Sequence, residues 1–393
     1  MARPQHRRNA GHRHLTTGLV VVGLFVGTGA VAAGTGLPSR VFADSSGRTS
    51  ATGQTTKAQA KGSGGSPKVA ATSTTVPSAA TGYARPALLA QAGDTKTACI
   101  TGQPGPALRQ AELQTGITYS CIETFTDNDR TWAEWVRPWI TVGGGAGFVS
   151  WVAADPTGHQ LIDTQNLIPD DQATDPAWTA ECAAGDFNSY AAQFATNMVA
   201  AGFGYSIIRL GHEMNGNWET DSVGNTVAER QKWGQCFAQE VTAMRSVDGA
   251  HFLFDWSINA GYRDLPLADF YPGDAYVDIV GISFYDQSGY PLPPVGSPQR
   301  WQALSGEPMG LDEVYAFAAR HHKPLGIGEW ATVTTQGDDA SYVTHMADFI
   351  ADHDVSYQAW FNAGDLHIYP LRATEDPQSV AAYKSTIAKD LKA

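Results

Sequence analysis

Residues 206–218 place a dense set of polar side chains directly after an apolar segment. They read SIIRLGHEMNGNW, so a run that suits a buried strand leads into Arg209, His212 and Glu213, and Trp218 closes the cluster. Polar groups at the carboxyl end of a buried parallel strand are typical of a site. The alternative is a structural ion-pair network in which His212 and Arg209 only neutralise Glu213, and it stays open.

A second stretch supplies a matching carboxyl group. Residues 324–330 read PLGIGEW, a short apolar strand that ends at Glu329 beside Trp330. Hydrolysis of a glycosidic bond uses two carboxyl groups, one that protonates the leaving oxygen and one that attacks or activates water. Trp218 and Trp330 each lie within five positions of one of the glutamates, and an indole face suits a sugar ring. The pair therefore favours glycoside hydrolysis.

The first 43 residues have the pattern of an export signal. Basic residues come first, and an uncharged, mostly apolar run follows over residues 15–33. Cleavage could follow Ala32, Ala33 or Ala43. An uncleaved signal anchor is the alternative, because the apolar run is nearly long enough to span a bilayer. Both interpretations place the rest of the chain outside the membrane, either secreted or tethered.

Composition divides the remainder into two parts. Residues 44–96 are rich in Ser, Thr, Gly, Ala and Pro and contain few large apolar side chains. Such a segment cannot offset the entropy of ordering, so we expect a flexible linker. Residues 97–393 have the length of one large α/β domain.

The charge of the chain limits the classes of partner. The formal net charge is −13 although the leader is basic, so the domain itself is more acidic still. This argues against nucleic acid and anionic membranes as partners and suits a neutral or cationic polymer. We expect a polysaccharide substrate and a monomer with no obligatory protein partner.

Four cysteines, Cys99, Cys121, Cys182 and Cys236, follow the linker. An even number in an exported chain favours two disulfides, for which three connectivities are possible. Cys99 and Cys121 fall on segments that we expect to be neighbouring strands. We therefore predict the pairs Cys99–Cys121 and Cys182–Cys236. Their wide spacing makes a metal site improbable, and no cofactor is expected.

Hydrophobic patterning predicts the architecture. Eight apolar segments suit strands, at residues 98–100, 117–122, 147–152, 206–212, 252–257, 277–284, 325–329 and 357–361. Helical periodicity occurs between them, at residues 132–139, 187–198, 233–244, 311–322, 340–353 and 379–391. This alternation predicts a (β/α)8 barrel, the TIM barrel fold. Glu213 then ends the fourth strand and Glu329 the seventh, on roughly opposite sides of the barrel mouth.

These features resemble a known family. A barrel with one glutamate after strand four and another after strand seven is similar to clan A of the retaining glycoside hydrolases. The string HEMNGNW at residues 212–218, preceded by Arg209, resembles glycoside hydrolase family 26, the β-mannanases. The resemblance spans most of the domain in the order of its elements, and its specific motifs are confined to strand ends.

The resemblance implies roles for individual residues. Glu213 would be the general acid/base and Glu329 the nucleophile. His212 would hydrogen-bond at the cleavage subsite, Tyr285 in ISFYD would contact the nucleophile, and Trp360 in AWFN would form the floor under the reacting sugar.

Further substrate-binding residues are expected around these. Trp218 and Trp256 are candidates for stacking on sugars, with Asn259 and Asp286 as weaker candidates. Arg209 is grouped with them, and its cation should lower the pKa of one of the two carboxyls. For each of these side chains a packing or structural role is the alternative.

One departure affects the expected substrate. Many β-mannanases continue this motif with further aromatic residues, whereas this chain continues with Glu219, Thr220, Asp221 and Ser222. The family also contains enzymes that act on xylan and mixed-linkage glucan, so these substrates stay open. Two other classes are a non-catalytic glycan-binding barrel, which would need no matched pair of carboxyls, and a metal-dependent barrel isomerase.

Overall fold

The computed structural model describes residues 97–127, 129–156, 158–362 and 370–387. The predicted leader and linker lie outside these residues. In the described part of the chain, no helix is both long and apolar enough to cross a membrane.

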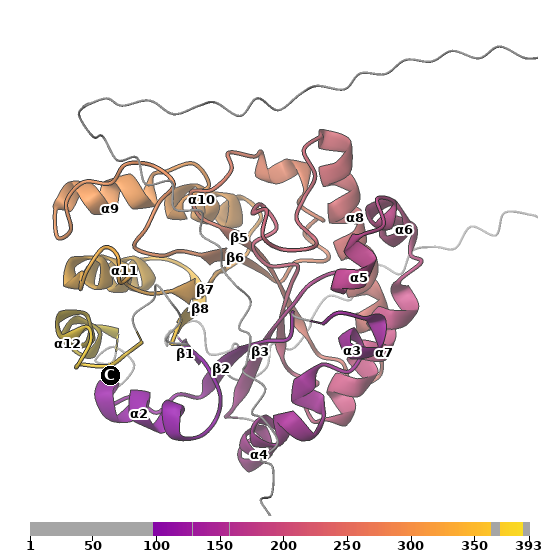
Figure 1. The fold of residues 1–393 in the computed structure, drawn as a ribbon, viewed down its shortest axis with the longest axis horizontal. Coiled ribbons are helices and arrows are strands. Elements are labelled where there is room, and N and C mark those ends of the chain that lie inside the picture. Colours follow the sequence, from indigo (N-terminus) through magenta and orange to yellow (C-terminus); the bar gives the residue numbers. More distant parts are fainter. Residues whose placement is uncertain (1–96, 128, 157, 363–369, 388–393) are drawn as a thin grey trace, which may run out of the picture. The chain divides into compact units, whose positions relative to one another are not determined.

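Eight parallel strands close into a barrel in the order of the sequence, each paired with the next and β8 paired with β1. The predicted (β/α)8 barrel is confirmed. In Figure 1 the helices lie around the outside of the strands. The strands are β1 (Thr97–Thr101), β2 (Cys121–Phe125), β3 (Gln160–Gln165), β4 (Ile207–Leu210), β5 (Leu253–Asn259), β6 (Ile279–Ser283), β7 (Leu325–Trp330) and β8 (Val355–Trp360).

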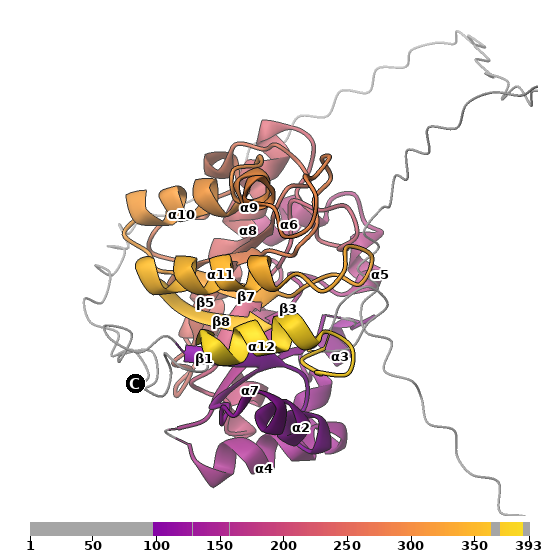
Figure 2. The ribbon, with the colours of Figure 1, turned by 90° about the vertical axis from the view of Figure 1, so that its left-hand side faces the viewer.

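The helices follow from amphipathic patterning and local caps. The longest, α8, begins with a capping box in which Thr226 and Glu229 each satisfy the other's backbone N–H. In both ribbon views α11 and α12 lie side by side over β7 and β8 (Figure 2). The α-helices are α2 (Pro106–Thr115), α3 (Trp132–Trp135), α4 (Ala146–Ala154), α5 (Asp170–Ala173), α6 (Trp178–Ala184), α7 (Asn188–Ala200), α8 (Val227–Arg245), α9 (Pro298–Ser305), α10 (Leu311–Arg320), α11 (Ala340–Asp352) and α12 (Pro377–Ser385). Three short 3-10 helices are η1 (Trp139–Thr141), η2 (Gly143–Gly145) and η3 (Leu267–Asp269).

The third strand is not where the hydrophobic pattern placed it. Residues 147–152 belong to helix α4, and β3 is the more polar segment QLIDTQ. The prediction failed because the residues of β3 are all buried despite their polarity: Thr164 faces polar partners inside the barrel, and Asp163 accepts a hydrogen bond from Thr126. The second strand was also placed too early, since β2 begins at Cys121.

Both predicted disulfides are confirmed. Cys99 and Cys121 are paired in register on β1 and β2 and are bonded to each other. They belong to an apolar cluster formed by side chains from seven of the strands. The second disulfide, Cys182–Cys236, joins α6 to α8.

A polar layer lies nearer the carboxyl ends of the strands. Two residues after the cysteine on β2 comes Glu123, and two after Ile207 on β4 comes Arg209, so the strand period of two keeps both side chains inside the barrel. Both are fully buried and form a salt bridge. This layer supports the groups at the mouth above it.

Candidate active site

Glu213 lies in the turn that follows β4. Its backbone has φ of 50°, one of three non-glycine residues with positive φ among those described, and Gly211 before it has φ of 59°. The Glu213 N–H donates to the carbonyl of Ser257 at 2.9 Å, which ties this strained turn to β5. Unusual backbone conformations of this kind are held by their surroundings and cluster at functional sites.

The carboxyl of Glu213 is held by two neutral donors. Trp218 donates its indole N–H to Oε2 at 2.7 Å, and Asn259 donates its amide to Oε1 at 2.9 Å. Asn259 is itself fixed because its backbone N–H donates to Asn215 Oδ1 at 2.7 Å. The ends of β4 and β5 therefore position this carboxyl together.

Glu329 lies near the end of β7 among stronger donors. Arg209 donates to Oε1 at 2.9 Å, and the hydroxyl of Tyr285 donates to Oε2 at 2.7 Å. The predicted contact between Tyr285 and Glu329 is present. Burial and the charge of Glu329 raise the pKa of Tyr285 well above its usual value, so its phenol stays protonated and available as a donor.

Ser283, the last residue of β6, acts on both carboxyls. Its hydroxyl donates to Glu329 Oε1 at 3.4 Å, and it lowers the pKa of Glu213. The charge of Glu329 also raises the pKa of Glu213, so the two carboxyls share the barrel mouth. Both glutamates are 1% exposed.

The two carboxyls differ in electrostatic environment. Burial, followed by the charge of Glu329, raises the pKa of Glu213 to about 7. The hydrogen bonds from Asn259 and Ser283 and the charge of Arg209 only partly oppose this rise. A carboxyl with this pKa is poised to exchange a proton near neutral pH.

Arg209 lies beneath Glu329 and is fully buried. Besides Glu329 it binds Glu123, and it donates to Ser257 at 3.0 Å and to Ser283 at 3.2 Å. A Cβ on Gly328 would lie 2.4 Å from its guanidinium carbon, so glycine is required there. The structure corrects the substrate-binding role predicted for Arg209, because its side chain is enclosed. Its charge opposes the rise in the pKa of Glu123, and its guanidinium also binds Glu329.

His212 and Trp218 lie beside the catalytic candidates as predicted. The ring of His212 is 5.8 Å from that of Phe125 in an edge arrangement, and burial followed by the charge of Arg209 lowers the pKa of the imidazole well below its usual value. Trp218 is half-buried and meets Tyr262 edge to face at 4.6 Å. Both side chains therefore line the mouth next to Glu213.

Two predicted tryptophan roles are wrong. Trp256 is completely buried outside the barrel, where it packs against Phe270 and Phe317. Trp360 is also completely buried and packs against Trp330 at 4.8 Å. Neither can stack on a sugar, because the side chains of successive strand residues alternate and these two point outward.

Phe361 takes the place at the mouth that was expected for Trp360. It follows β8, and its ring lies 5.8 Å from Phe125 and 6.1 Å from Tyr285. The strand period could have identified it: Tyr357 faces inward and bonds Asp255, so the inward residues of this strand are the odd-numbered ones.

Asp286 is also corrected. Its side chain is fully buried and accepts a hydrogen bond from Arg300 at 2.7 Å, so it anchors the loop after β6. Burial raises the pKa of Asp286 to about 6, and the contact with Arg300 limits that rise. The contact with Arg300 therefore gives this carboxyl a structural role.

Sequence reasoning assigned no site role to three acidic side chains near the mouth. Glu123, beneath Glu329, has its pKa raised to about 8 by burial, with Arg209 opposing the rise. Asp127 and Glu219 lie beside His212, and burial is the main cause that raises their pKa values to about 8 and about 10. An acidic residue inside the strand CIETF was a usable signal for Glu123; Asp127 is brought near Glu219 only by the fold.

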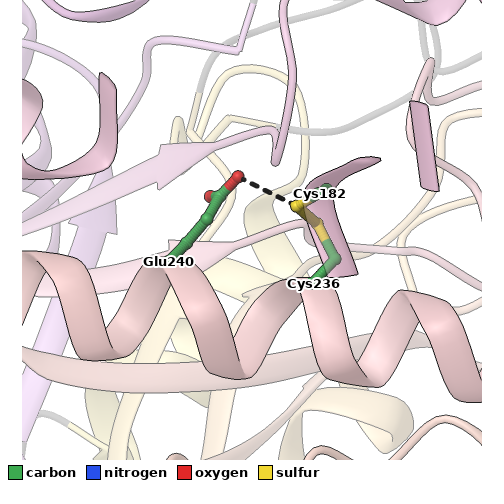
Figure 3. Close-up of side chains that lie close together, drawn as sticks. All are labelled: Cys182, Cys236 and Glu240. Carbon is green, nitrogen blue, oxygen red and sulfur yellow. Dashed lines mark hydrogen bonds between the residues drawn. A yellow bond between two sulfur atoms is a disulfide. The ribbon is translucent and has the colours of Figure 1, made fainter. Parts of the chain in front are cut away.

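Two groups of described side chains have metal-ligand atoms close together. One is Asp127, His212 and Glu219 at the mouth. The other is Cys182, Cys236 and Glu240, where Glu240 Oε1 lies 3.6 Å from Cys182 Sγ (Figure 3). The sulfurs of this second group are joined in a disulfide and offer no thiolate, and burial raises the pKa of Glu240 well above its usual value. The second group is therefore poorly suited to a metal.

Comparison with known families identifies the class. Residues 190–293 match the model of glycosyl hydrolase family 26. The matched region covers about a quarter of the chain, from α7 to the loop after β6, and includes Glu213, Asn259 and Tyr285. The resemblance to glycoside hydrolase family 26 is confirmed. The predicted enzyme class, a glycoside hydrolase, is confirmed with it.

Solved structures show the same fold for this glycoside hydrolase. A family 26 β-mannanase from Bacteroides ovatus has a TM-score of 0.57 at 14% identity, with 77% of this chain and 91% of that chain covered. A Cellulomonas fimi endo-β-1,4-mannanase double mutant has 0.53 at 16%, covering 75% and 71%. The catalytic domain of a Bacillus sp. JAMB-750 family 26 endo-β-1,4-mannanase has 0.54 at 17%, covering 77% and 88%. No curated protein matches the sequence.

Proposed function

We propose that the chain is a secreted, retaining endo-β-1,4-mannanase in which Glu213 is the acid/base and Glu329 the nucleophile. The observation that carries this proposal is that two buried carboxyls at the barrel mouth have different surroundings. Neutral donors hold Glu213, whereas Arg209 and Tyr285 bind Glu329. Two carboxyls that straddle one bond need such a difference, because one must hold a proton while the other is ionised.

The first step forms a glycosyl-enzyme. Glu213 gives its proton to the glycosidic oxygen, the bond from that oxygen to the anomeric carbon breaks, and a carboxylate oxygen of Glu329 bonds to the same carbon. Arg209 holds the carboxylate of Glu329 in place through its 2.9 Å contact. Tyr285 orients the same carboxylate through Oε2.

The second step releases the sugar. Glu213, now ionised, takes a proton from water while the water oxygen bonds to the anomeric carbon and the ester bond to Glu329 breaks. The anomeric configuration is retained, since two inversions occur. A pKa of about 7 suits Glu213 to act first as acid and then as base.

The choice of mannan rests on the similar structures, which are β-mannanases. The residues that follow Trp218 depart from an aromatic continuation, and Glu219 and Asp221 are acidic. Xylan and mixed-linkage glucan therefore belong in any substrate test. Secretion is supported by the N-terminal signal pattern and by the two disulfides.

NMR of the products from mannan, xylan and mixed-linkage β-glucan tests the proposal, because it reports linkage and anomeric configuration together. We expect β-configured oligosaccharides from mannan at the earliest time points, before mutarotation. Initial α-products would contradict the double displacement, and products from xylan or glucan alone would contradict the substrate. No products from any of them would favour a glycan-binding barrel.

A further inference from the structure

Two loops bring a histidine and two carboxyls together at the barrel mouth. Asp127 follows β2, and His212 and Glu219 belong to the loop after β4. One ligand atom from each lies within 4.8 Å of the others. His212 Nε2 is 3.7 Å from Asp127 Oδ2 and 3.8 Å from Glu219 Oε1.

His212 points into this group without being satisfied by it. The side chain is 5% exposed, and both separations from Nε2 to the carboxyls exceed hydrogen-bond distance. The other ring nitrogen, Nδ1, is buried and has no hydrogen-bond partner among the described residues. The Nε2 atom, which faces the two carboxyls, is bonded to neither of them and is available to a ligand placed between them.

The distances fit an ion between the three side chains. Bonds of about 2.1 Å from nitrogen and oxygen to a tetrahedral Zn²⁺ place the ligand atoms about 3.4 Å apart. The two separations from Nε2 are a few tenths of an ångström longer, so small side-chain movements would close the site. One imidazole and two carboxylates form a donor set that suits Zn²⁺ and similar divalent ions.

Neighbouring side chains already orient the two residues that would supply carboxylate ligands, Asp127 and Glu219. The Asn166 amide donates to the Asp127 carbonyl at 3.1 Å and to Glu219 Oε2 at 3.5 Å, so it links the two carboxyl-bearing loops. Arg209, which could otherwise balance their charge, binds Glu123 and Glu329 instead. Supporting hydrogen bonds to ligand residues are typical of metal sites.

We propose that Asp127, His212 and Glu219 bind one divalent transition-metal ion such as Zn²⁺, with water in the remaining coordination positions. His212 directly precedes Glu213 in the chain, so the ion lies next to the proposed acid/base and occupies space at the sugar-binding mouth. Binding of the metal is then competitive with an oligosaccharide. The inference goes beyond the proposed function, because metal binding is a property of the protein without substrate.

Calorimetric titration of chelator-treated full-length protein with ZnCl₂ tests the site. We expect one ion per chain and an affinity at least tenfold weaker in Glu219→Gln, which removes one ligand oxygen at a partly exposed position. Glu375→Gln, an exposed glutamate in an ion pair with Arg372, is the matched control and should bind as the original chain does. Circular dichroism verifies that each variant is folded.

A second readout separates this site from other zinc-binding surfaces. Titration with CoCl₂ should give visible absorption bands of a bound Co²⁺ ion, and Glu219→Gln should weaken them. Mannohexaose added beforehand should weaken zinc binding. No zinc binding, or equal binding by Glu219→Gln and the original chain, would overturn the proposal whether or not the protein hydrolyses mannan.

Discussion

Glu213 and Glu329 are the same residue type at the same depth, yet the two sides of the barrel mouth surround them with different hydrogen-bond donors. Trp218 and Asn259 hold Glu213, and neither carries a charge. Glu329 instead rests on the Arg209 guanidinium and the Tyr285 hydroxyl. Chemically identical side chains therefore lie in distinct electrostatic environments, and the polar layer inside the barrel supplies that difference.

Removing the carboxyl on the Arg209 side should cause the largest loss. We expect Glu329→Ala to lower kcat on mannan by about 10⁴-fold or more, because no group remains to form the glycosyl-enzyme. Steady-state rates with circular dichroism measure this, and Glu375→Ala is the surface control. Activity within tenfold of the original enzyme would show that Glu329 is not the nucleophile.

The loss of activity caused by removing the Glu213 carboxyl should depend on the leaving group of the substrate. Glu213→Ala is expected to lose about 10² to 10⁴-fold on mannan, which needs a proton, and much less on an aryl mannoside with an acidic phenol. Azide should accelerate the second step, since it attacks without a base. Equal losses on both substrates would remove the acid assignment.

Glu123 tests whether the polar layer creates the difference. Glu123→Gln leaves Arg209 to pair with Glu329 alone, which should hold the Glu329 carboxylate more tightly to the guanidinium and make it a weaker nucleophile. We expect kcat to fall about tenfold with KM unchanged, because only the charge balance beneath the site is altered. A change in KM alone would place Glu123 in substrate binding instead.

Substitutions of Trp360 and Phe361, at the end of β8 and just after it, test which of the two side chains faces the mouth. Phe361→Ala should raise KM several-fold, since Phe361 faces Tyr285 at the mouth. Trp360→Phe should leave KM unchanged and lower the melting temperature, because Trp360 packs against Trp330. Kinetics and thermal unfolding of both variants distinguish these outcomes. A raised KM in Trp360→Phe with an unchanged KM in Phe361→Ala would show that Trp360 lies under the reacting sugar after all.

The smallest effect should appear in the pH profile. Glu213 must be protonated to act as the acid, so kcat/KM should fall as pH rises through about 7. The Asn259 hydrogen bond lowers the pKa of Glu213, so Asn259→Ala should raise that pKa and move the alkaline limb to higher pH. A limb that moves to lower pH would contradict the assignment.

The sequence was sufficient for the architecture and the main pair because both follow local patterns. Glu213 and Glu329 end apolar strands, and the helix–strand alternation predicts the barrel. The errors have a common physical source, which is that strand side chains alternate and barrel interiors can be polar. Trp256 and Trp360 were assigned to the mouth from the family resemblance although they point outward, and QLIDTQ was missed because its polar residues are buried.

Contacts between distant segments could not be predicted. The link from Glu123 through Arg209 to Glu329 joins three strands, and the approach of Asp127 to His212 depends on two separate loops. The residue types did not indicate which carboxyl Arg209 would bind. Strand register determines it, because the same inward-facing layer holds Arg209 and Glu123.

Trapping of the covalent intermediate tests the central claim most directly. An activated 2-deoxy-2-fluoro mannoside slows the second step, so intact-mass spectrometry should show one added sugar, and peptide mapping should place it on Glu329. Glu213→Ala with the same reagent should be labelled on Glu329 as well. A label on Glu213, or efficient turnover of mannan to α-configured products without any labelled protein, would contradict the account.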